Sequence, residues 1–536
     1  MTIEQQIADA RRDTIGDALR RAAACHRDRI ALGFGERRWS YAALDQAADR
    51  IAQRLLGAGL GRGDRVVAFG RNSDAYLLAW LGCVRAGLVH VPANYALNAE
   101  ELGYIARQSG AAAILYQPAL AATAEAVREG LGLRLGATID AGHEADGLPD
   151  LLATATDRRW DPPAGTDLAA ALDENDLVQI IYTSGTTAAP KGAMMTHRAQ
   201  LAEYLSCIQA LDFSAGDRGL AALPLYHTAQ MHAFCMPQLL VGSYTRLIEA
   251  PDPALVLRLI EEERLTSFFA PPTVWIGLLR HPDFDRRDLG SLRRAYYGAA
   301  IMPLPVLEEL QRRLPSAGLY NCYGQSEIGP LATVLRPEEH AARPSSVGRP
   351  VLLVQTRVVD GDMRDVPPGE RGEIVHRSPQ LLLGYWDKPA ETAAAFAGGW
   401  FHSGDVGTMD AEGYIAVVDR VKDVINTGGV LVASREVEDA LFSHPAVAEV
   451  AVIALPDPKW IEAIAAIVVL RDGAELDVGM AEETLIAHAR DRLAPYKLPK
   501  RVILAESLPK NPSGKLLKRE LRARYGGRAD AVPGVG

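Results

Sequence analysis

Segments with apolar residues at helical spacing alternate along the chain with short, continuous apolar runs. The helical spacing predicts helices at residues 17–24, 41–57 and 74–86. The apolar runs predict strands at residues 65–70, 88–93, 112–116, 178–182, 246–249 and 295–297. Strands that alternate with helices are typical of parallel sheets covered by helices. The pattern therefore predicts an α/β fold.

The composition is that of an acidic, globular protein. The 536 residues carry 57 Lys and Arg against 67 Asp and Glu, a formal net charge of −10, and 48% of them are hydrophobic. These values exclude a disordered or fibrous chain and make nucleic acid an unexpected partner. The charge balance shifts near residue 420, and residues 497–528 hold ten basic residues against two acidic ones. We therefore expect a large domain over residues 1–419, a small one over 420–525 and a flexible tail over 526–536.

Five cysteines are scattered along the chain without a Cys-x-x-Cys pair. This pattern is neither a disulfide framework nor a zinc site, and it suits a reducing compartment. The first residues are polar and include acids, unlike a secretory signal, and no run of about eighteen apolar residues occurs. We expect a soluble, cytoplasmic protein.

One segment carries the clearest chemical signal. The predicted strand 178–182 runs into Thr183-Ser-Gly-Thr-Thr-Ala-Ala-Pro-Lys191. Hydroxyl groups and loop N–H groups donate to phosphate oxygens, and Gly185 lets the backbone approach a ligand closely. The segment is not a Walker loop, because Pro190 precedes the lysine and Gly192 follows it. The alternative interpretation is that this Ser/Thr-rich stretch is an ordinary flexible turn.

Residues 182–192 resemble the phosphate-loop motif of the adenylate-forming (ANL) superfamily, which includes acyl-CoA synthetases, beetle luciferases and the adenylation domains of peptide synthetases. Further matching segments follow in the expected order, at residues 323–327, 372–379, 400–405, 419–423 and 511–515. The resemblance extends from about residue 14 to residue 524, and six ordered motifs are far more specific than any single one. It implies a large domain of two α/β sheet subdomains plus a small β-barrel-like subdomain, followed by a small, mobile α+β domain.

The resemblance also implies the substrates and their contacts. ATP, Mg²⁺ and coenzyme A are expected, together with a small carboxylic acid, and a homodimer is compatible with the sequence although nothing in it indicates one. Thr183 and Glu327 are the expected metal ligands, and Lys515, His227 and Glu327 are the expected catalytic residues. The expected contacts to ATP or AMP are Thr183, Ser184, Gly185, Thr186, Thr187, Lys191, Gly298, Ala299, Ala300, Tyr323, Gly324, Gln325, Ser326, Asp405 and Arg420.

The reaction explains why such residues are needed. Forming an acyl-adenylate brings a carboxylate to an anionic phosphate, and two unit charges about 4 Å apart repel by about 4 kcal/mol at an effective dielectric near 20. Mg²⁺, Lys515 and hydroxyl donors would cancel this repulsion. In the family, Tyr323 would stack on adenine and Asp405 would bind the ribose hydroxyls. Lys515 must later give way to a thiol, which a hinge at Asp419 and Arg420 would allow.

The acid itself is less well defined by the sequence. No acidic residue lies between Leu223 and Leu240, where peptide-synthetase domains hold an amino group, so an amino acid is disfavoured. His227 resembles the family's gate residue, and an apolar pocket suited to an acyl chain is expected from Met231, Phe234, Trp275 and Tyr297. The same residues would also suit an ordinary core. We expect a medium- to long-chain fatty acid; alternatives are an aryl acid, transfer to a carrier protein, or a luciferase-like oxidase.

The acceptor is expected to be coenzyme A. Residues 427–438 resemble the loop beside the pantetheine tunnel of CoA ligases, with Gly428 and Gly429 allowing close approach. The match is imperfect, since Val430-Leu431 stands where many relatives have Glu-Asn and Ser434 where they have Pro. The basic residues 497–528 either meet the phosphates of coenzyme A or form a solvated charged face.

Overall fold

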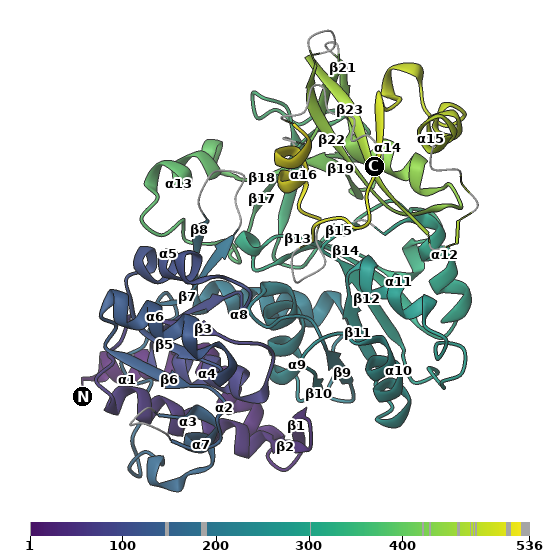
Figure 1. Cartoon of the computed structure of the whole chain (residues 1–536). Coiled ribbons are helices and arrows are strands. Elements are labelled where there is room, and N and C mark those ends of the chain that lie inside the picture. Colours follow the sequence, from purple (N-terminus) through teal and green to yellow (C-terminus); the bar gives the residue numbers. More distant parts are fainter. Residues whose placement is uncertain are drawn as a thin grey trace.

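The computed structural model describes residues 2–144, 149–183, 190–300, 302–420, 423–427, 430–457, 461–471, 473–474, 476, 480–510 and 516–526. Seven residues expected in the site lie outside these ranges: Ser184, Gly185, Thr186, Thr187, Gly428, Gly429 and Lys515. The α/β fold class is confirmed: a large N-terminal domain carries most of the sheets and a smaller C-terminal domain follows it (Figure 1).

The first large sheet has six strands in the order β6-β5-β3-β4-β7-β8. Its neighbours are parallel except for the last pair, β7 and β8, which is antiparallel. The strands are β3 (Arg65–Phe69), β4 (Val89–Ala93), β5 (Ala111–Tyr116), β6 (Leu135–Thr138), β7 (Leu177–Thr183) and β8 (Lys191–Thr196). The helices of this unit are α3 (Tyr41–Gly57), α4 (Asp74–Ala86), α5 (Ala99–Ser109), α6 (Ala121–Leu131) and α7 (Leu151–Thr156).

The second large sheet has nine strands in the order β15-β14-β13-β12-β11-β9-β10-β1-β2, with six parallel strands in the middle. They are β1 (Ile30–Phe34), β2 (Arg37–Ser40), β9 (Arg218–Ala221), β10 (Tyr244–Leu247), β11 (Ser267–Ala270), β12 (Arg294–Gly298), β13 (Gly318–Gly324), β14 (Leu331–Leu335) and β15 (Arg349–Pro350). The associated helices are α2 (Ile15–Cys25), α8 (His197–Ala210), the π-helix η3 (Ala229–Cys235), α9 (Met236–Leu240), α10 (Pro253–Glu262), α11 (Pro272–Arg280) and α12 (Leu304–Arg313).

Two smaller sheets complete the chain. An antiparallel sheet of four strands contains β16 (Gln355–Val359), β17 (Gly372–Arg377), β18 (Phe401–Met409) and β19 (Ile415–Arg420), with α13 (Pro389–Ala395) between β17 and β18. The C-terminal sheet contains β20 (Ile425–Thr427), β21 (Val430–Val432), β22 (Val447–Asp457), β23 (Ile461–Leu470) and β24 (Arg501–Leu504), with helices α14 (Ser434–Phe442), α15 (Ala481–Arg490) and α16 (Lys518–Tyr525). The C-terminal unit lies at the top of Figure 1 and has a core of its own. The expected domain border at residues 419 and 420 falls at the end of β19.

The predicted helices at 41–57 and 74–86 have the same bounds in the structure, as α3 and α4. The helix predicted at 17–24 begins earlier, at Ile15, because Thr14 caps it: the Thr14 side chain accepts from the backbone N–H of Asp17, and the Asp17 side chain accepts from that of Thr14. The strand predicted at 246–249 is displaced to Tyr244–Leu247. Helix α1 (Ile3–Arg11) was not predicted. Among the residues that the structure describes, no helix could cross a membrane.

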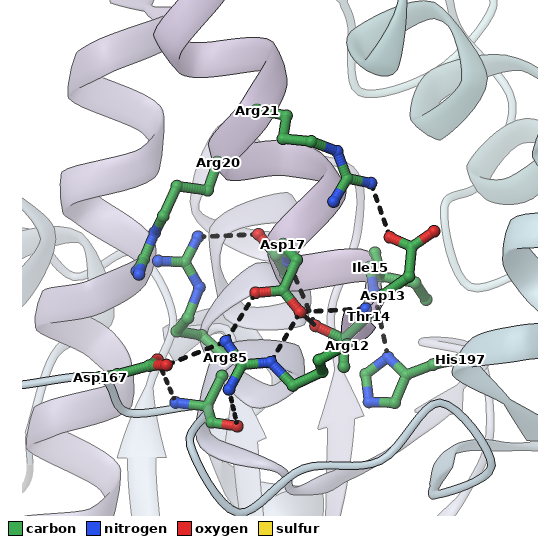
Figure 2. A network of polar contacts seen from close by, with 12 residues as sticks. Arg12, Asp13, Thr14, Ile15, Asp17, Arg20, Arg21, Arg85, Asp167 and His197 are labelled. Atoms are coloured by element: carbon green, nitrogen blue, oxygen red, sulfur yellow. Dashed lines mark hydrogen bonds and ion pairs between the residues drawn. The ribbon is translucent and has the colours of Figure 1, made fainter. Parts of the chain in front are cut away.

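A charged network holds α2 against its surroundings (Figure 2). Arg12 donates to both carboxylate oxygens of Asp17, at 3.0 and 2.9 Å, and to Asp167 at 2.9 Å. Arg85, on α4, is only 1% exposed and pairs with Asp45 and Asp49 of α3. The network therefore ties the N-terminal segment and the helices of the first sheet together.

Candidate active site

The expected phosphate loop lies between two antiparallel strands. Thr183 ends β7, Lys191 begins β8, and the two residues are register partners across the pair. The residues that immediately flank residues 184–189 are therefore fixed by a strand pair. This geometry places the hydroxyl of Thr183 and the ammonium of Lys191 at the base of that loop.

Glu327 joins the second sheet to this base. The Thr183 hydroxyl donates to Oε1 of Glu327 at 3.1 Å, and the Tyr385 hydroxyl donates to the same oxygen at 3.2 Å. The Lys191 ammonium lies over the Tyr385 ring, 4.2 Å from its centroid. Glu327 is 8% exposed. A lysine, two hydroxyls and one carboxylate therefore lie together beside Thr183 and Lys191, the two residues that bracket the loop.

This donor set suits Mg²⁺ in the way that nucleotide-dependent enzymes hold it. Both hydrogen bonds that described residues make to the Glu327 carboxylate go to Oε1, and a carboxylate oxygen is the hard ligand that Mg²⁺ prefers. The described residues contain no cluster of three or more His, Cys, Asp or Glu that could hold a metal by themselves. Mg²⁺ usually binds through one or two carboxylates and completes its coordination with phosphates and water. Glu327 and Thr183 fit such a role.

A second polar cluster forms where the small antiparallel sheet meets β13. Asp405 on β18 and Arg420 on β19 are register partners, and the Arg420 Nε lies 2.7 Å from Oδ1 of Asp405. The Tyr323 hydroxyl donates to Oδ2 of Asp405 at 2.7 Å. Asp405 is only 4% exposed. Arg420 and Tyr323 thus orient the two carboxylate oxygens of Asp405. The expected binding of ribose by Asp405 stays a prediction.

The backbone around Tyr323 is shaped by close contacts. A Cβ atom on Gly298 would lie 2.3 Å from the carbonyl oxygen of Cys322 on the neighbouring strand, so glycine is required there. Ala299 follows with a φ of +63°, in the left-handed region, and both Ala299 and Ala300 are exposed. The chain therefore leaves β12 through a sharp turn. Its expected contact with adenine, opposite Tyr323, stays a prediction.

The segment from Gly324 to Glu327 is also closely packed. A Cβ atom on Gly324 would lie 1.9 Å from the carbonyl oxygen of Pro330, which only glycine avoids. The Nε2 atom of Gln325 is buried and finds no hydrogen-bond partner among the described residues. The Ser326 and Thr228 hydroxyls lie 3.1 Å apart. This contact brings the segment beside the residue that follows His227.

His227 lies half-buried at the end of the turn that precedes η3, with its ring 4.6 Å from that of Tyr226. Its proximity to Ser326, through Thr228, places it beside the Glu327 segment. The position is compatible with the expected gate role, which stays a prediction.

The four other residues expected in the acyl pocket do not share one wall. Met231 packs in the core between α2, α4 and the first sheet, while Phe234 packs face to face on Phe269 at 4.3 Å. Trp275 and Tyr297 belong to a third cluster, on the other side of the second sheet. The structure therefore distributes these four side chains among three parts of the core.

Tyr385 and Gln380 contribute to the site and were not expected there. Both lie in the segment between β17 and α13, more than fifty residues after Glu327. Tyr385 binds Glu327 directly, and Gln380 donates to the backbone of Ile328 and Leu331. The nearby motif at residues 372–379 marks this part of the chain, but no spacing in the sequence connects it to Glu327.

Comparison with known proteins agrees with this geometry. The sequence matches the AMP-binding enzyme family over residues 19–386 and the C-terminal domain of AMP-binding enzymes over residues 436–515. It is 39% identical over 498 residues to a feruloyl-CoA synthase of an Amycolatopsis species, covering 92% of this chain and 96% of that protein. It is 36% identical over 521 residues to a medium/long-chain-fatty-acid–CoA ligase of Mycobacterium tuberculosis, covering 93% and 88%.

A solved structure supports the same conclusion. ATP-bound MatB from Rhodopseudomonas palustris matches with a TM-score of 0.85 and 29% sequence identity, over 95% of this chain and 99% of that one. The chain belongs to the AMP-binding, adenylate-forming enzyme family.

Proposed function

We propose that the protein is an AMP-forming acid–CoA ligase, which activates a carboxylic acid with ATP and passes the acyl group to coenzyme A. The observation that carries this proposal is the position of Glu327 beside the expected phosphate loop: it contacts Thr183 directly, and it contacts Tyr385, whose ring packs against the Lys191 ammonium. A single carboxylate beside a lysine and hydroxyls suits a nucleotide that arrives with its own metal ion.

In the first half-reaction, a carboxylate oxygen attacks the α-phosphorus of ATP, and the bond to pyrophosphate breaks. Thr183 and Glu327 would hold Mg²⁺, which supplies positive charge against the phosphate oxygens when bound. Lys191 would stabilise the phosphates, while Asp405, oriented by Tyr323 and Arg420, would fix the ribose. These groups act by position and charge, because a phosphoryl oxygen must be neutralised before an anion can attack.

In the second half-reaction, the thiol of coenzyme A loses its proton and attacks the acyl carbon. The C–S bond forms as AMP leaves. Lys515 would serve the first half-reaction, and Gly428 and Gly429 would border the thiol in the second. Rotation of the C-terminal domain at Asp419 and Arg420 would exchange the two sets of residues.

For the acid, we propose an aromatic carboxylic acid, with a medium- or long-chain fatty acid as the second candidate. The feruloyl-CoA synthase relative is the support for the aromatic class. The fatty-acid–CoA ligase of similar identity supports the second candidate. Burial of the aliphatic chain of a fatty acid would be worth about 0.8 kcal/mol per methylene.

A substrate panel tests the proposal. Purified protein is incubated with Mg-ATP, coenzyme A and single acids, namely acetate to octadecanoate, benzoate, coumarate and ferulate, and thioesters are detected by mass. The highest kcat/KM is expected for a hydroxycinnamate. Preference for a C8–C18 chain would replace the aromatic class by the fatty acid. Acyl-AMP that never passes to coenzyme A, or light emission with oxygen, would instead indicate a carrier-protein donor or a luciferase-like oxidase.

A further inference from the structure

A fully buried acid lies behind the loop that carries Glu327. Glu203, on α8, is 0% exposed, and its Oε1 accepts hydrogen bonds from the backbone N–H of Leu331 at 2.9 Å and from the Cys207 thiol at 3.1 Å. Its Oε2 accepts from the side-chain amide of Gln380 at 2.5 Å. A carboxyl group is costly to bury, so its retention here calls for a specific role.

Gln380 extends this contact to the backbone around Glu327. Its amide donates to the carbonyl oxygens of Ile328 at 3.1 Å and Leu331 at 3.0 Å, while its own oxygen accepts from Ser206 of α8 at 2.6 Å. The backbone N–H of Leu382 donates to the carbonyl oxygen of Glu327 at 2.8 Å. The loop is therefore held by hydrogen bonds to its main chain at Glu327 and at residues that follow it.

The segment that holds the loop is itself attached to β8. The backbone N–H of Leu383 donates to Met194 at 2.8 Å, and that of Trp386 donates to Gly192 at 2.7 Å. Glu203, Gln380 and residues 382–386 thus form a continuous connection from α8 through the Glu327 loop to the strand that begins with Lys191.

The loop also fits closely against the buried acid. Gly329 has a φ of +108°, and a Cβ atom on it would lie 3.0 Å from Oε2 of Glu203. Any side chain at residue 329 would therefore be both strained and crowded. The loop backbone packs directly on the carboxyl group, so a change in the length or polarity of residue 203 is felt by the residues next to Glu327.

We infer that Glu203 is a positioning residue for the metal ligand: with Gln380, it fixes the loop 327–331 so that Glu327 presents its free oxygen to Mg²⁺. The inference rests on the proposed role of Glu327. Partners that orient a metal ligand typically change metal affinity by about 10- to 100-fold when they are removed. The same range is expected here.

The test compares Glu203→Leu, Glu203→Gln and Gln200→Leu. Leucine at residue 203 keeps the volume but removes both acceptors, whereas glutamine keeps one oxygen for the Leu331 N–H. Gln200 is the matched control, because it is buried on the same helix and its amide has no hydrogen-bond partner among the described residues. Mn²⁺ binding to the full protein with ATP, but no acid, is measured by electron paramagnetic resonance.

We expect Glu203→Leu to weaken Mn²⁺ binding about tenfold or more and to raise the Mg²⁺ concentration for half-maximal pyrophosphate release in parallel, with kcat at saturating Mg²⁺ largely kept. Glu203→Gln keeps the acceptor for the Leu331 N–H but turns an amide donor towards the donating amide of Gln380, so its Mn²⁺ affinity should fall between those of wild type and Glu203→Leu. Gln200→Leu should match wild type. If Glu203→Leu does not fold, Gln380→Leu should give the same loss of Mn²⁺ affinity, because it removes the other partner of the Glu203–Gln380 hydrogen bond.

Wild-type Mn²⁺ affinity in folded Glu203→Leu or Gln380→Leu would overturn the inference. An equal loss in Gln200→Leu would do the same, because it would indicate a general effect of altering α8. If wild-type protein neither binds Mn²⁺ with ATP nor releases pyrophosphate with any acid, the proposed function itself fails. That outcome is distinct, since it appears before any variant is compared.

Discussion

At the scale of single residues, the chemistry depends on how one carboxylate oxygen is occupied and the other is left available. Thr183 and Tyr385 both donate to Oε1 of Glu327, which directs Oε2 away from them. A carboxylate held by two hydroxyls cannot rotate freely, so in the proposed role of Glu327 its second oxygen would be preorganised for a cation. Preorganisation of this kind is where active sites gain most of their electrostatic effect.

Glu327→Gln should lower the rate of pyrophosphate release on the order of 10²- to 10³-fold, because the amide cannot neutralise a cation. Tyr385→Phe removes one hydrogen bond to the carboxylate, worth about 1.5 kcal/mol, and should lower the rate about tenfold. Both rates are measured with saturating ATP and acid. Equal losses in the two variants would contradict the assigned difference between a metal ligand and the residue that orients it.

The sequence predicts site roles for Thr183, Lys191 and Glu327 because each lies inside a short motif whose residue types match the chemistry of phosphate and metal, and the structure brings the three residues together around Tyr385. Tyr385 and Glu203 could not be found in this way. Their partners lie 58 and 128 residues away along the chain. Such contacts depend on how two sheets and a helix pack, which residue type and spacing do not reveal.

At the scale of elements, the N-terminal helices depend on buried charge. Arg85 is 1% exposed and reaches Asp45 at 2.5 Å, and it also pairs with Asp49. Arg85→Leu should lower the free energy of unfolding by about 3–5 kcal/mol, because two carboxylates lose their buried partner. Urea unfolding followed by circular dichroism measures the change.

Arg21→Leu is the control for this substitution. Arg21 also pairs with an aspartate, Asp13. In this pair, however, both side chains reach solvent: Arg21 is 59% exposed and Asp13 is 50% exposed. Solvent screens such a pair, so the control should stay within about 0.5 kcal/mol of wild type. A small effect of Arg85→Leu, equal to that of the control, would show that the network does not stabilise the fold.

The stability of the N-terminal helices should also depend on pH through Asp17, on α2. Desolvation raises the pKa of Asp17, but hydrogen bonds from Arg12 and Thr14 outweigh it and lower the pKa from 3.8 to about 2. The ionised form is therefore favoured in the folded state, and its contribution to stability is present above about pH 4 and lost as the pH falls towards 2. The urea midpoint of wild type should exceed that of Asp17→Asn at pH 5, and the difference should shrink below pH 4. A difference that is constant from pH 5 to pH 2.5 would contradict the assignment.

Elements with strong local signals could be predicted, and those shaped by packing could not. Helices α3 and α4 carry regular apolar spacing and clear ends, and both have the predicted bounds. The aromatic residues expected in one pocket are divided because successive side chains of a strand point to opposite faces. Phe268 packs with Trp275 and Phe269 with Phe234, on the two sides of β11. Face assignment needs the neighbours of a strand, which the sequence alone does not give.

At the scale of the whole molecule, the two large sheets are not consecutive pieces of chain. Strand β1, near the N-terminus, pairs in parallel with β10, so residues 32–34 lie beside residues 245–247 in the second sheet. The first sheet is formed from residues in between. The sequence predicted α/β layers and a C-terminal unit, but the order of strands depends on pairings between distant segments that no local pattern encodes.

Asp419 lies where the join between the large and small domains is expected, at the end of β19. Its Oδ2 accepts from the backbone N–H of Ser434 at 2.6 Å, at the start of α14, and Lys518 donates to the Ser434 hydroxyl at 2.7 Å. Burial raises the pKa of Asp419, and the nearby charge of Lys518 lowers it by less. The last residues of β19 are thus tied directly to the C-terminal unit.

Asp419→Pro fixes one backbone dihedral at this join and should block movement between the half-reactions. We expect acyl-AMP to accumulate with less than a tenth of the wild-type rate of thioester formation. Single-turnover assays that separate acyl-AMP from acyl-CoA measure both steps. Asp419→Ala is the control for the loss of the Ser434 contact alone, and wild-type turnover in Asp419→Pro would contradict the hinge.

The central claim, that the protein joins a carboxylic acid to the α-phosphate of ATP, is tested most directly by acid-dependent exchange of labelled pyrophosphate into ATP. Wild type should catalyse exchange with at least one acid of the panel, and Lys515→Ala should lower the rate on the order of 10²- to 10³-fold, as loss of a charge-stabilising donor does. Thioester formation from supplied acyl-AMP should be spared in that variant. Absence of exchange with every acid, or exchange unaffected by Lys515→Ala, would contradict the account.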